Sequence, residues 1–366
     1  FRGPFKGFAV IDRGLISFQI ANRDPALSRI VAGFCLFELL LEDGLTAGQD
    51  RYDRDRADQG RYNSYFHFFI LLGNLKVYIE QIRLTITYQI EYKSQINKEL
   101  KMLFQCDFHS AELGMATRMN IIMPQKMSNV YGVDEKETEV KDIPVLYLLH
   151  GCSDDQSIWC RRTSIERYAA EYNLAIVMPC GARSFYTDMA HGQKWFSFIA
   201  CELPELIENY FPVSRKREDT FIAGLSMGGY GAFKIALKRP DKFGAAASLS
   251  GAVDMGGWSL KMESESAPMV EEMKNIYGDI HKIYGSEEDI FALSDKVVKG
   301  GGPRPDLFQI CGTEDFLYED NIRLRNHLDS IDYGLKYFEE PGIHCWAFWD
   351  RNIQKVLKWL PLAENK

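Results

Sequence analysis

Residues Thr220–Gly231 read TFIAGLSMGGYG, and this segment contains the most specific motif of the chain. It begins with a short apolar run, Thr220–Ala223, that is typical of a buried strand, and it continues into residues that favour a helix. Between them lies a Gly-x-Ser-x-Gly motif with Ser226 at its centre. In a sharp turn from strand to helix, the positions two before and two after the serine must be small, and Gly224 and Gly228 supply that room. The turn places the hydroxyl at a helix N-terminus, which favours developing negative charge, so we predict that Ser226 is a nucleophile.

A phosphate-binding turn is the alternative interpretation of a glycine-rich segment between a strand and a helix. That interpretation requires Gly-x-Gly-x-x-Gly, with an acidic residue about 20 positions further on. The run Gly228–Gly231 does not have this spacing. The sequence therefore favours a nucleophilic serine over a phosphate site.

Short apolar runs typical of strands buried on both faces recur along the chain. They are Pro144–Leu149, Leu174–Met178, Thr220–Ala223, Ala245–Leu249 and Leu307–Ile310. Patterns that favour helices alternate with them, at Ser164–Tyr172, Ile199–Tyr210, Gly228–Lys238, Asn321–Ser330 and Asp350–Leu360. This alternation predicts an α/β protein with a mostly parallel central sheet flanked by helices, and the serine turn indicates the α/β-hydrolase fold. We expect the long polar segment 255–299 to form a cap over the site.

The sequence changes character near residue 100. All twelve methionines and all six tryptophans lie at or beyond Met102, and residues 1–101 show no convincing period. We therefore divide the chain into an unassigned N-terminal extension, 1–101, and an enzyme domain, 102–366. We interpret the extension as translated upstream sequence or a disordered segment, because Lys98 and Glu99 can be encoded by AAGGAG, a bacterial ribosome-binding sequence. A genuine but divergent extension is the alternative.

Composition excludes several classes of partner. The 366 residues carry a net charge of −8, which argues against nucleic acid as the main partner, because phosphate binding needs a basic face. The longest apolar runs are too short for a membrane span and are broken by polar residues, so we expect no membrane partner. The eight cysteines are scattered, without the spacing of a zinc site or a redox pair. Since no secretory signal opens the printed sequence, we expect reduced thiols, a cytoplasmic protein, and neither a metal nor an organic cofactor.

A nucleophilic serine needs a histidine that takes its proton, and in this fold the histidine comes last in the chain. His344 lies in a turn-rich loop after an apparent strand, Leu335–Phe338, and before the last predicted helix. Catalytic groups gather in such loops at the carboxyl ends of parallel strands. His281 lies in a polar segment and His327 within a predicted helix, and we expect both at the surface. We therefore predict His344 as the base.

The histidine needs a carboxylate that orients it, and this acid precedes it in the chain. The segment Cys311–Asp315 follows the predicted strand Leu307–Ile310 directly, and both Glu314 and Asp315 qualify chemically. We favour Asp315.

Acyl transfer also needs two backbone N–H groups that bind the developing oxyanion. The residue after the nucleophile, Met227, supplies one of them in this fold. The second normally comes from the loop after an early strand, which here begins with His150, Gly151 and Cys152. We predict Cys152 as the second donor, through its backbone alone, and we expect His150 to make structural hydrogen bonds within the loop.

With these residues in place, the region 102–362 resembles the Putative esterase family. The segments that carry the resemblance are Pro144–Gly151 with Trp159, Phe185–Asp188, Glu202–Pro204, Phe221–Gly231, Cys311–Leu317 with Asn321, and Gly342–Asp350. The family includes tributyrin esterases, S-formylglutathione hydrolases (esterase D), feruloyl and acetylxylan esterases, and mycolyltransferases, and the chain is most similar to small bacterial tributyrin esterases. The resemblance implies a triad of Ser226, Asp315 and His344 and a preference for short acyl chains. The loop His150–Ser153 departs from that of most S-formylglutathione hydrolases, which makes that substrate less expected.

Aromatic side chains are the candidates for the substrate pocket: Trp159, Tyr186, Trp195 and Trp346. Taken singly, each is explained equally well as a core residue.

The predicted function is hydrolysis of short-chain carboxylic esters through an acyl-enzyme, with a small-molecule ester as the partner. The alternatives are hydrolysis of S-formylglutathione or of feruloyl or acetyl esters of carbohydrates, acyl transfer to an alcohol, and a silent binding scaffold. A homo-oligomer is compatible with the sequence.

Overall fold

The structure is a computed structural model that describes residues 9–11, 14–16, 101–124, 141–262 and 266–362. The chain divides into two compact units, Phe1–Tyr88 and Gln89–Lys366. In the first unit the described residues form an antiparallel pair of strands, β1 (Ala9–Ile11) and β2 (Gly14–Ile16). The prediction for the extension 1–101 otherwise lies outside the described residues, apart from Lys101.

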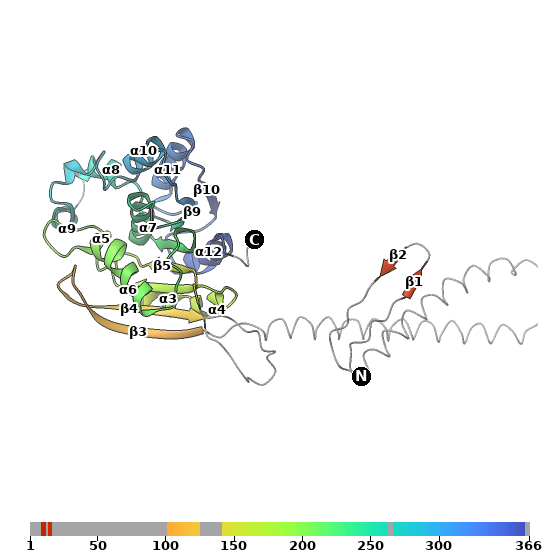
Figure 1. Cartoon of the computed structure of the whole chain (residues 1–366). Helices are drawn as coiled ribbons and strands as arrows, with labels where there is room; N and C mark the ends of the chain where they lie inside the picture. The colour runs from red at the N-terminus through yellow and green to blue at the C-terminus, as the bar shows by residue number, and fades with distance from the viewer. Residues whose placement is uncertain (1–8, 12–13, 17–100, 125–140, 263–265, 363–366) are drawn as a thin grey trace, which may run out of the picture. The chain divides into compact units, whose positions relative to one another are not determined.

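The second unit is built on an eight-stranded sheet with the order β10-β9-β8-β7-β5-β6-β4-β3 (Figure 1). The strands are β3 (Lys101–Ser110), β4 (Met115–Pro124), β5 (Val145–Leu149), β6 (Ala175–Pro179), β7 (Thr220–Leu225), β8 (Ala245–Leu249), β9 (Asp306–Gly312) and β10 (Lys336–Glu340). All pairings from β10 to β6 are parallel, whereas β4 runs antiparallel to both β6 and β3. The carboxyl ends of six strands therefore meet at one edge of the sheet.

Alternating side chains of the strands enter two separate cores. Leu146 and Leu148 of β5 lie in one cluster, whereas Val145, Tyr147 and Leu149 lie in the other. The first cluster is covered by α3 (Ile158–Arg162), α4 (Ile165–Ala169) and α12 (Trp346–Trp359). The second is covered by α5 (Trp195–Ser197), the π-helix η1 (Phe198–Glu202), α6 (Leu203–Tyr210), α7 (Met227–Lys238) and α11 (Tyr318–Ser330). The sheet is thus enclosed between two helical layers, and a short 3-10 turn, η2 (Arg217–Asp219), leads into β7.

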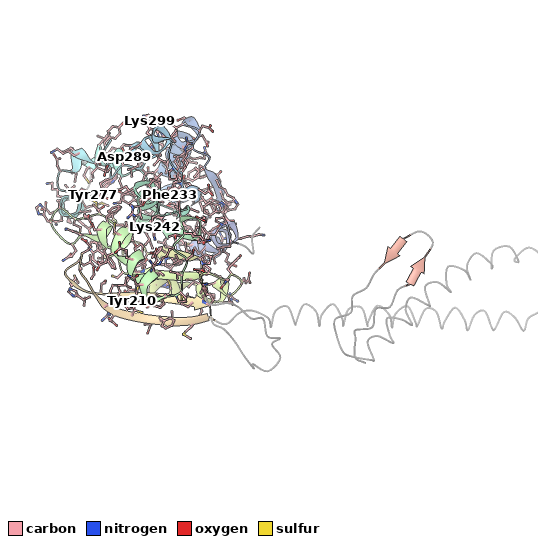
Figure 2. All side chains as sticks on the ribbon, viewed as in Figure 1. Tyr210, Phe233, Lys242, Tyr277, Asp289 and Lys299 are labelled. Carbon is pink, nitrogen blue, oxygen red and sulfur yellow. The ribbon has the colours of Figure 1, made fainter. Side chains whose placement is uncertain are left out.

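Helix α7 lies at the centre of the second helical layer. Its residues Met227–Leu237 are all buried. Phe233 lies in the interior, whereas Tyr210 of α6 and Lys299 lie at the surface (Figure 2). Burial along nearly the whole helix fixes its N-terminus, which follows Ser226, against the end of the sheet.

Helical pieces make up much of what the structure describes of the segment predicted as a cap. They are α8 (Met255–Ser259), α9 (Ala267–Tyr277), the 3-10 turn η4 (Ile280–Lys282) and α10 (Ile290–Gly300). The end of α9 accepts two backbone hydrogen bonds from the loop after β6: Ala190 N donates to Ile276 O at 2.8 Å and His191 N to Asn275 O at 2.9 Å. The segment is therefore joined to the loops at the carboxyl edge of the sheet.

A buried ion pair joins the same segment to α7. The Nζ of Lys234, fully buried in α7, lies 2.6 Å from the carboxylate of Glu288, which precedes α10. The ammonium also donates to Phe185 O at 3.0 Å and to Thr187 Oγ1 at 2.6 Å. One side chain thus connects the nucleophile helix, the loop after β6 and the cap segment.

The predicted strands and helices correspond to β5–β10, α4, α6, α7, α11 and α12, with shifts at their ends. The largest shifts are at α6, which begins at Leu203 and not at Ile199, and at α12, which begins at Trp346 and not at Asp350. Strands β3 and β4 were not predicted. In the described part of the chain, no helix is both long enough and apolar enough to cross a membrane.

Candidate active site

Ser226 occupies a strained turn between β7 and α7. Its φ of 53° and ψ of −120° lie where side chains other than glycine are rare. A Cβ at Gly224 would come within 2.4 Å of the carbonyl oxygen of Gly228, and a Cβ at Gly228 would come within 2.7 Å of the carbonyl oxygens of Leu149 and His150, so both positions require glycine. The neighbouring strand holds the turn: Ser226 N donates to Leu249 O at 2.9 Å, and Ser226 O accepts from Ala252 N at 3.1 Å. The hydroxyl is therefore presented from a rigid backbone.

The structure brings the three predicted triad side chains together. His344 Nε2 lies 3.0 Å from Ser226 Oγ, and His344 Nδ1 lies 3.0 and 2.9 Å from the two carboxylate oxygens of Asp315. Because an ionised carboxylate only accepts hydrogen bonds, Nδ1 carries the proton and Nε2 accepts from the serine. The side chain of Asp315 is fully buried, and its Oδ1 also accepts from Leu317 N at 2.9 Å.

Glu314, the chemical alternative to Asp315, has a different position. It is exposed, and its carboxylate accepts a hydrogen bond from Gly342 N, while its own N–H donates to Gly342 O at 3.1 Å. The bond from Gly342 holds the pKa of Glu314 below its usual value. Glu314 therefore fastens the loop of Asp315 to the loop of His344.

The other two histidines that we considered lie elsewhere, as does the neighbouring acid Asp320. His281 is exposed, and His327 is half-buried at 3.1 Å from Asp295. Asp320 lies within the first turn of α11 and pairs with Arg323.

Both predicted oxyanion donors belong to backbone segments close to Ser226. Met227 is the first residue of α7, where backbone N–H groups have no partner within the helix. On the other side, a Cβ placed on Gly151 would lie 3.7 Å from Ser226 Cβ, which brings the Gly151–Cys152 peptide beside the nucleophile. Burial raises the pKa of the Cys152 thiol, so the side chain is uncharged at neutral pH.

His150 holds this loop in place, as predicted. It is buried, its Nε2 accepts from Gly181 N at 2.8 Å, and its Nδ1 lies 2.7 Å from Gly151 O. The bond from Gly181 assigns the proton to Nδ1, which therefore donates to Gly151 O. Burial lowers the pKa of His150, in agreement with a neutral ring. A third bond, from Tyr186 OH to His150 O at 2.9 Å, ties the loop to the segment after β6.

The four aromatic pocket candidates differ in position. Trp159 and Tyr186 are fully buried, and the indole of Trp159 donates to Leu149 O at 3.0 Å. Trp195 is also buried and packs on Phe198. Trp346 is half-buried at the start of α12, 5.2 Å from the ring of Trp159. Trp159 and Tyr186 therefore support the loop after β5 from the core, and Trp346 is the most accessible of the four.

Two aromatic residues that the sequence analysis did not select contact the histidine. The ring of Phe316, which is exposed, lies 4.6 Å from the His344 ring, and the buried ring of Trp349 lies 4.8 Å from it in an edge-to-face arrangement. Phe316 directly follows Asp315, so its position in the sequence was the available signal.

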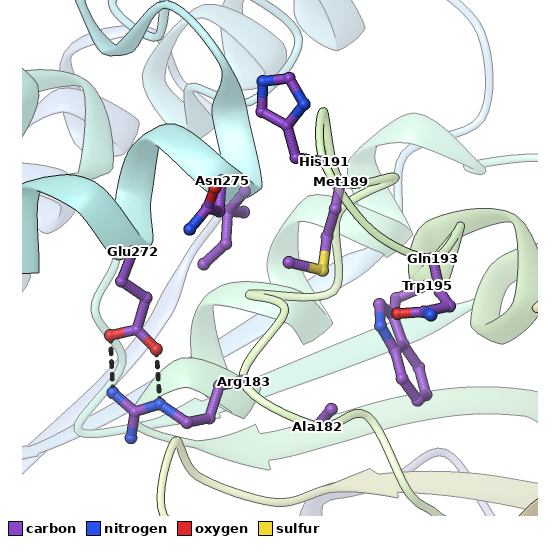
Figure 3. A pocket seen from close by; sticks show the side chains of 9 residues that line it. Ala182, Arg183, Met189, His191, Gln193, Trp195, Glu272 and Asn275 are labelled. Atoms are coloured by element: carbon purple, nitrogen blue, oxygen red, sulfur yellow. Dashed lines mark hydrogen bonds and ion pairs between the residues drawn. The ribbon is translucent and has the colours of Figure 1, made fainter.

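A cavity of about 400 Å³ lies between the loop after β6 and helix α9 (Figure 3). Its lining residues are Ala182, Arg183, Met189, His191, Gln193, Trp195, Glu272, Asn275 and Ile276. At its edge Arg183 makes a bidentate ion pair with Glu272 of α9, at 2.5 and 2.7 Å. The bond to Glu272 raises the pKa of Arg183, and the same bond lowers the pKa of Glu272.

Within the described ranges, no three His, Cys, Asp or Glu side chains are grouped so that they could hold a metal ion. The cysteines of these ranges are free thiols: Cys106, Cys152, Cys160, Cys180, Cys201, Cys311 and Cys345.

Comparison with known proteins agrees with this geometry. The model of the Putative esterase family matches residues 110–360. The acetyl esterase of Caldicellulosiruptor saccharolyticus is 32% identical over 263 residues, which cover 70% of this chain and 97% of the relative.

Solved structures of serine hydrolases are also similar to this chain. FphF of Staphylococcus aureus, a fluorophosphonate-binding serine hydrolase, is 36% identical with a TM-score of 0.64 and covers 71% of this chain and 98% of its own. The S-formylglutathione hydrolase FrmB of S. aureus is 36% identical with a TM-score of 0.62 over the same shares of the two chains. The predicted fold class is thereby confirmed. The chain belongs to the Putative esterase family and is a serine carboxylesterase of the α/β-hydrolase fold.

Proposed function

We propose that this esterase cleaves short-chain acyl esters, with Ser226 as nucleophile, His344 as base and Asp315 as the residue that orients the base. The observation that carries the proposal is the 3.0 Å contact between His344 Nε2 and Ser226 Oγ, made while Nδ1 is held by Asp315. A serine hydroxyl becomes an effective nucleophile at neutral pH only with such a base.

In the first half of the reaction, Ser226 Oγ attacks the ester carbonyl and its proton passes to His344 Nε2. The negative charge that develops on the carbonyl oxygen is bound by the N–H groups of Met227 and Cys152. The imidazolium is stabilised by Asp315, and it then donates its proton to the departing alcohol. An acyl group remains on Ser226.

In the second half, water takes the place of the alcohol. His344 removes a proton from the water, which attacks the acyl carbonyl, and the same two N–H groups bind the second oxyanion. Collapse of this intermediate returns the proton to Ser226 and releases the acid.

The acetyl esterase relative supports an acetyl or similarly short acyl group. A second candidate is the thioester S-formylglutathione, because the S. aureus FrmB structure carries that name at 36% identity. Both substrates use the same triad and differ in the leaving group.

The test is hydrolysis of p-nitrophenyl acetate, butyrate and octanoate, and of S-formylglutathione, by the wild type and by Ser226→Ala. We expect acetate and butyrate to be preferred over octanoate, and Ser226→Ala to lower turnover by about 10⁴- to 10⁶-fold. Preference for octanoate would contradict the short-chain assignment, and activity that survives Ser226→Ala would contradict the nucleophile. A kcat/KM for S-formylglutathione far above that for the esters would favour the second candidate.

We also propose a cytoplasmic location, which the free cysteines of the described ranges support. A homo-oligomer is proposed from sequence alone, and size-exclusion chromatography with light scattering tests it.

A further inference from the structure

Cys152 lies between two peptide groups, and both of their carbonyls accept hydrogen bonds. Its own N–H belongs to the Gly151–Cys152 peptide, whose oxygen accepts from His150 Nδ1 at 2.7 Å. The oxygen of the next peptide, Cys152 O, accepts from Arg183 Nη1 at 3.4 Å. Because each peptide group is planar, fixing its oxygen also fixes the direction of its N–H. The His150 bond therefore sets the direction of the Cys152 N–H, and the Arg183 bond holds the carbonyl on the other side of the same residue, so that Cys152 is restrained on both sides.

Arg183 links this loop to the cap segment. Its Nε and Nη2 are both bonded to the carboxylate of Glu272 on α9, which leaves Nη1 for Cys152 O. The guanidinium is planar and its nitrogens have fixed relative positions, so the pair with Glu272 sets the direction of Nη1. The position of α9 is thereby transmitted through one side chain to the loop beside Ser226.

We propose that Arg183 and Glu272 are positioning residues for the oxyanion hole, and that they couple cap helix α9 to the backbone N–H of Cys152. This inference rests on the proposed function, in which the Cys152 N–H binds the oxyanion. Arg183 acts through the loop and not on the substrate. Its loss therefore weakens transition-state binding and leaves ground-state binding unchanged.

The ion pair is well suited to this test because it adds little to folding. The side chains of Arg183 and Glu272 are 56% and 28% exposed, and ion pairs that water reaches contribute little to stability. Variants at these positions are therefore expected to fold.

The chain offers a matched control in Arg239, the residue that follows α7. Its Nε and Nη2 are bonded to both carboxylate oxygens of Asp241, and its Nη1 donates to a backbone carbonyl, Ala200 O, at 3.1 Å. Arg239 thus repeats the bonding pattern of Arg183. Helix α7 has twelve residues, so at 1.5 Å per residue Arg239 lies about 20 Å from Ser226.

The experiment measures kcat and KM for p-nitrophenyl acetate, and the Ki of a trifluoromethyl ketone that forms a tetrahedral adduct with the serine. The variants are Arg183→Ala, Arg183→Lys, Glu272→Gln, Arg239→Ala and Ser226→Ala. Removing a whole oxyanion donor costs about 10²- to 10³-fold, so we expect misdirecting one in Arg183→Ala to lower kcat about tenfold with KM within about twofold. The Ki should rise by the same factor as kcat falls.

Arg183→Lys and Glu272→Gln should give smaller losses of the same kind, since a single ammonium cannot make all three bonds and an uncharged amide holds the guanidinium less firmly. Arg239→Ala should match the wild type in kcat, KM and Ki.

Three results would overturn the inference: an unchanged kcat in Arg183→Ala, a raised KM at unchanged kcat, which would place Arg183 against the substrate, or an equal loss of kcat in Arg239→Ala. Ser226→Ala separates this failure from that of the proposed function. If Ser226→Ala is inactive and Arg183→Ala is fully active, the inference alone fails, whereas an active Ser226→Ala removes both.

Discussion

Asp315 determines which nitrogen of His344 faces the serine. Both of its carboxylate oxygens lie within 3.0 Å of Nδ1, and its side chain is fully buried, so that the interaction is shielded from water. The proton is held on Nδ1, and the lone pair of Nε2 remains available to Ser226. Phe316 and Trp349 pack against the ring and restrict its rotation.

Substitution of the two adjacent acids, Asp315 and Glu314, tests which of them orients His344. In Asp315→Asn, the side-chain amide can donate to Nδ1 and so favours the tautomer with its proton on Nε2. We expect kcat to fall about 10⁴-fold, as for other triads with this change.

Glu314→Gln is the comparison. It replaces an exposed acceptor of one backbone bond, from Gly342, and should lower kcat by less than about tenfold, the value of one ordinary hydrogen bond. A larger loss in Glu314→Gln than in Asp315→Asn would reverse the assignment of the acid.

At the scale of elements, Lys234 of α7 joins three pieces of the structure. Burial lowers its pKa to about 8, although Glu288 opposes this shift. Burial by itself raises the pKa of Glu288. The nearby charges of Lys234 and Lys238 lower this pKa by more, so the pKa of Glu288 lies below its usual value. We infer that Glu288 is ionised at neutral pH and that Lys234 is its buried counterion.

Lys234→Met should therefore destabilise the fold. It leaves the Glu288 carboxylate without its buried partner and Phe185 O without a donor, which we expect to cost about 3 kcal/mol in the free energy of unfolding. Lys238→Met, which removes a more exposed contact to the same carboxylate, should cost about 1 kcal/mol or less. Urea denaturation of both variants measures the difference, and equal losses would show that burial of the pair is unimportant.

The same lysine predicts a dependence of stability on pH. Its folded pKa of about 8 lies below the value of about 10.4 in an unfolded chain, so between these two values the unfolded state binds the additional proton. The part of the stability that is linked to this titration is fully present above pH 10.4 and is lost as the pH falls through 8, while the ion pair with Glu288 still contributes at neutral pH. The free energy of unfolding of the wild type, minus that of Lys234→Met, should rise by on the order of 3 kcal/mol between pH 8 and 10.4. A difference that is constant across this range would refute the lowered pKa.

At the scale of the whole molecule, the parallel sheet assembles the site. Ser226, Asp315 and His344 follow β7, β9 and β10, whose carboxyl ends lie at one edge, and the loop of Cys152 follows β5 at the same edge. Residues separated by 118 positions, Ser226 and His344, thus come within hydrogen-bond distance.

The parts of this arrangement that were predictable have strong local signals. Strands buried on both faces, such as β5 and β7, are continuous apolar runs, and the serine turn has a fixed spacing of glycines. Strand β3 was not predicted, because it lies at the sheet edge and alternates exposed with half-buried side chains. Strand β4 was not predicted either, although its last six residues are buried. The bonds of Arg183 to Cys152 and Glu272 join positions 31 and 89 residues apart, and no local pattern marks such pairs.

The central claim is that Ser226 is the activated nucleophile of this chain, and labelling with a fluorophosphonate tests it most directly. The reagent reacts irreversibly with a serine that a neighbouring histidine activates, and peptide mass spectrometry locates the adduct. We predict one adduct, on the peptide that contains Ser226, and no adduct in Ser226→Ala or His344→Ala. An adduct on another residue, or labelling of Ser226 that persists in His344→Ala, would contradict the account.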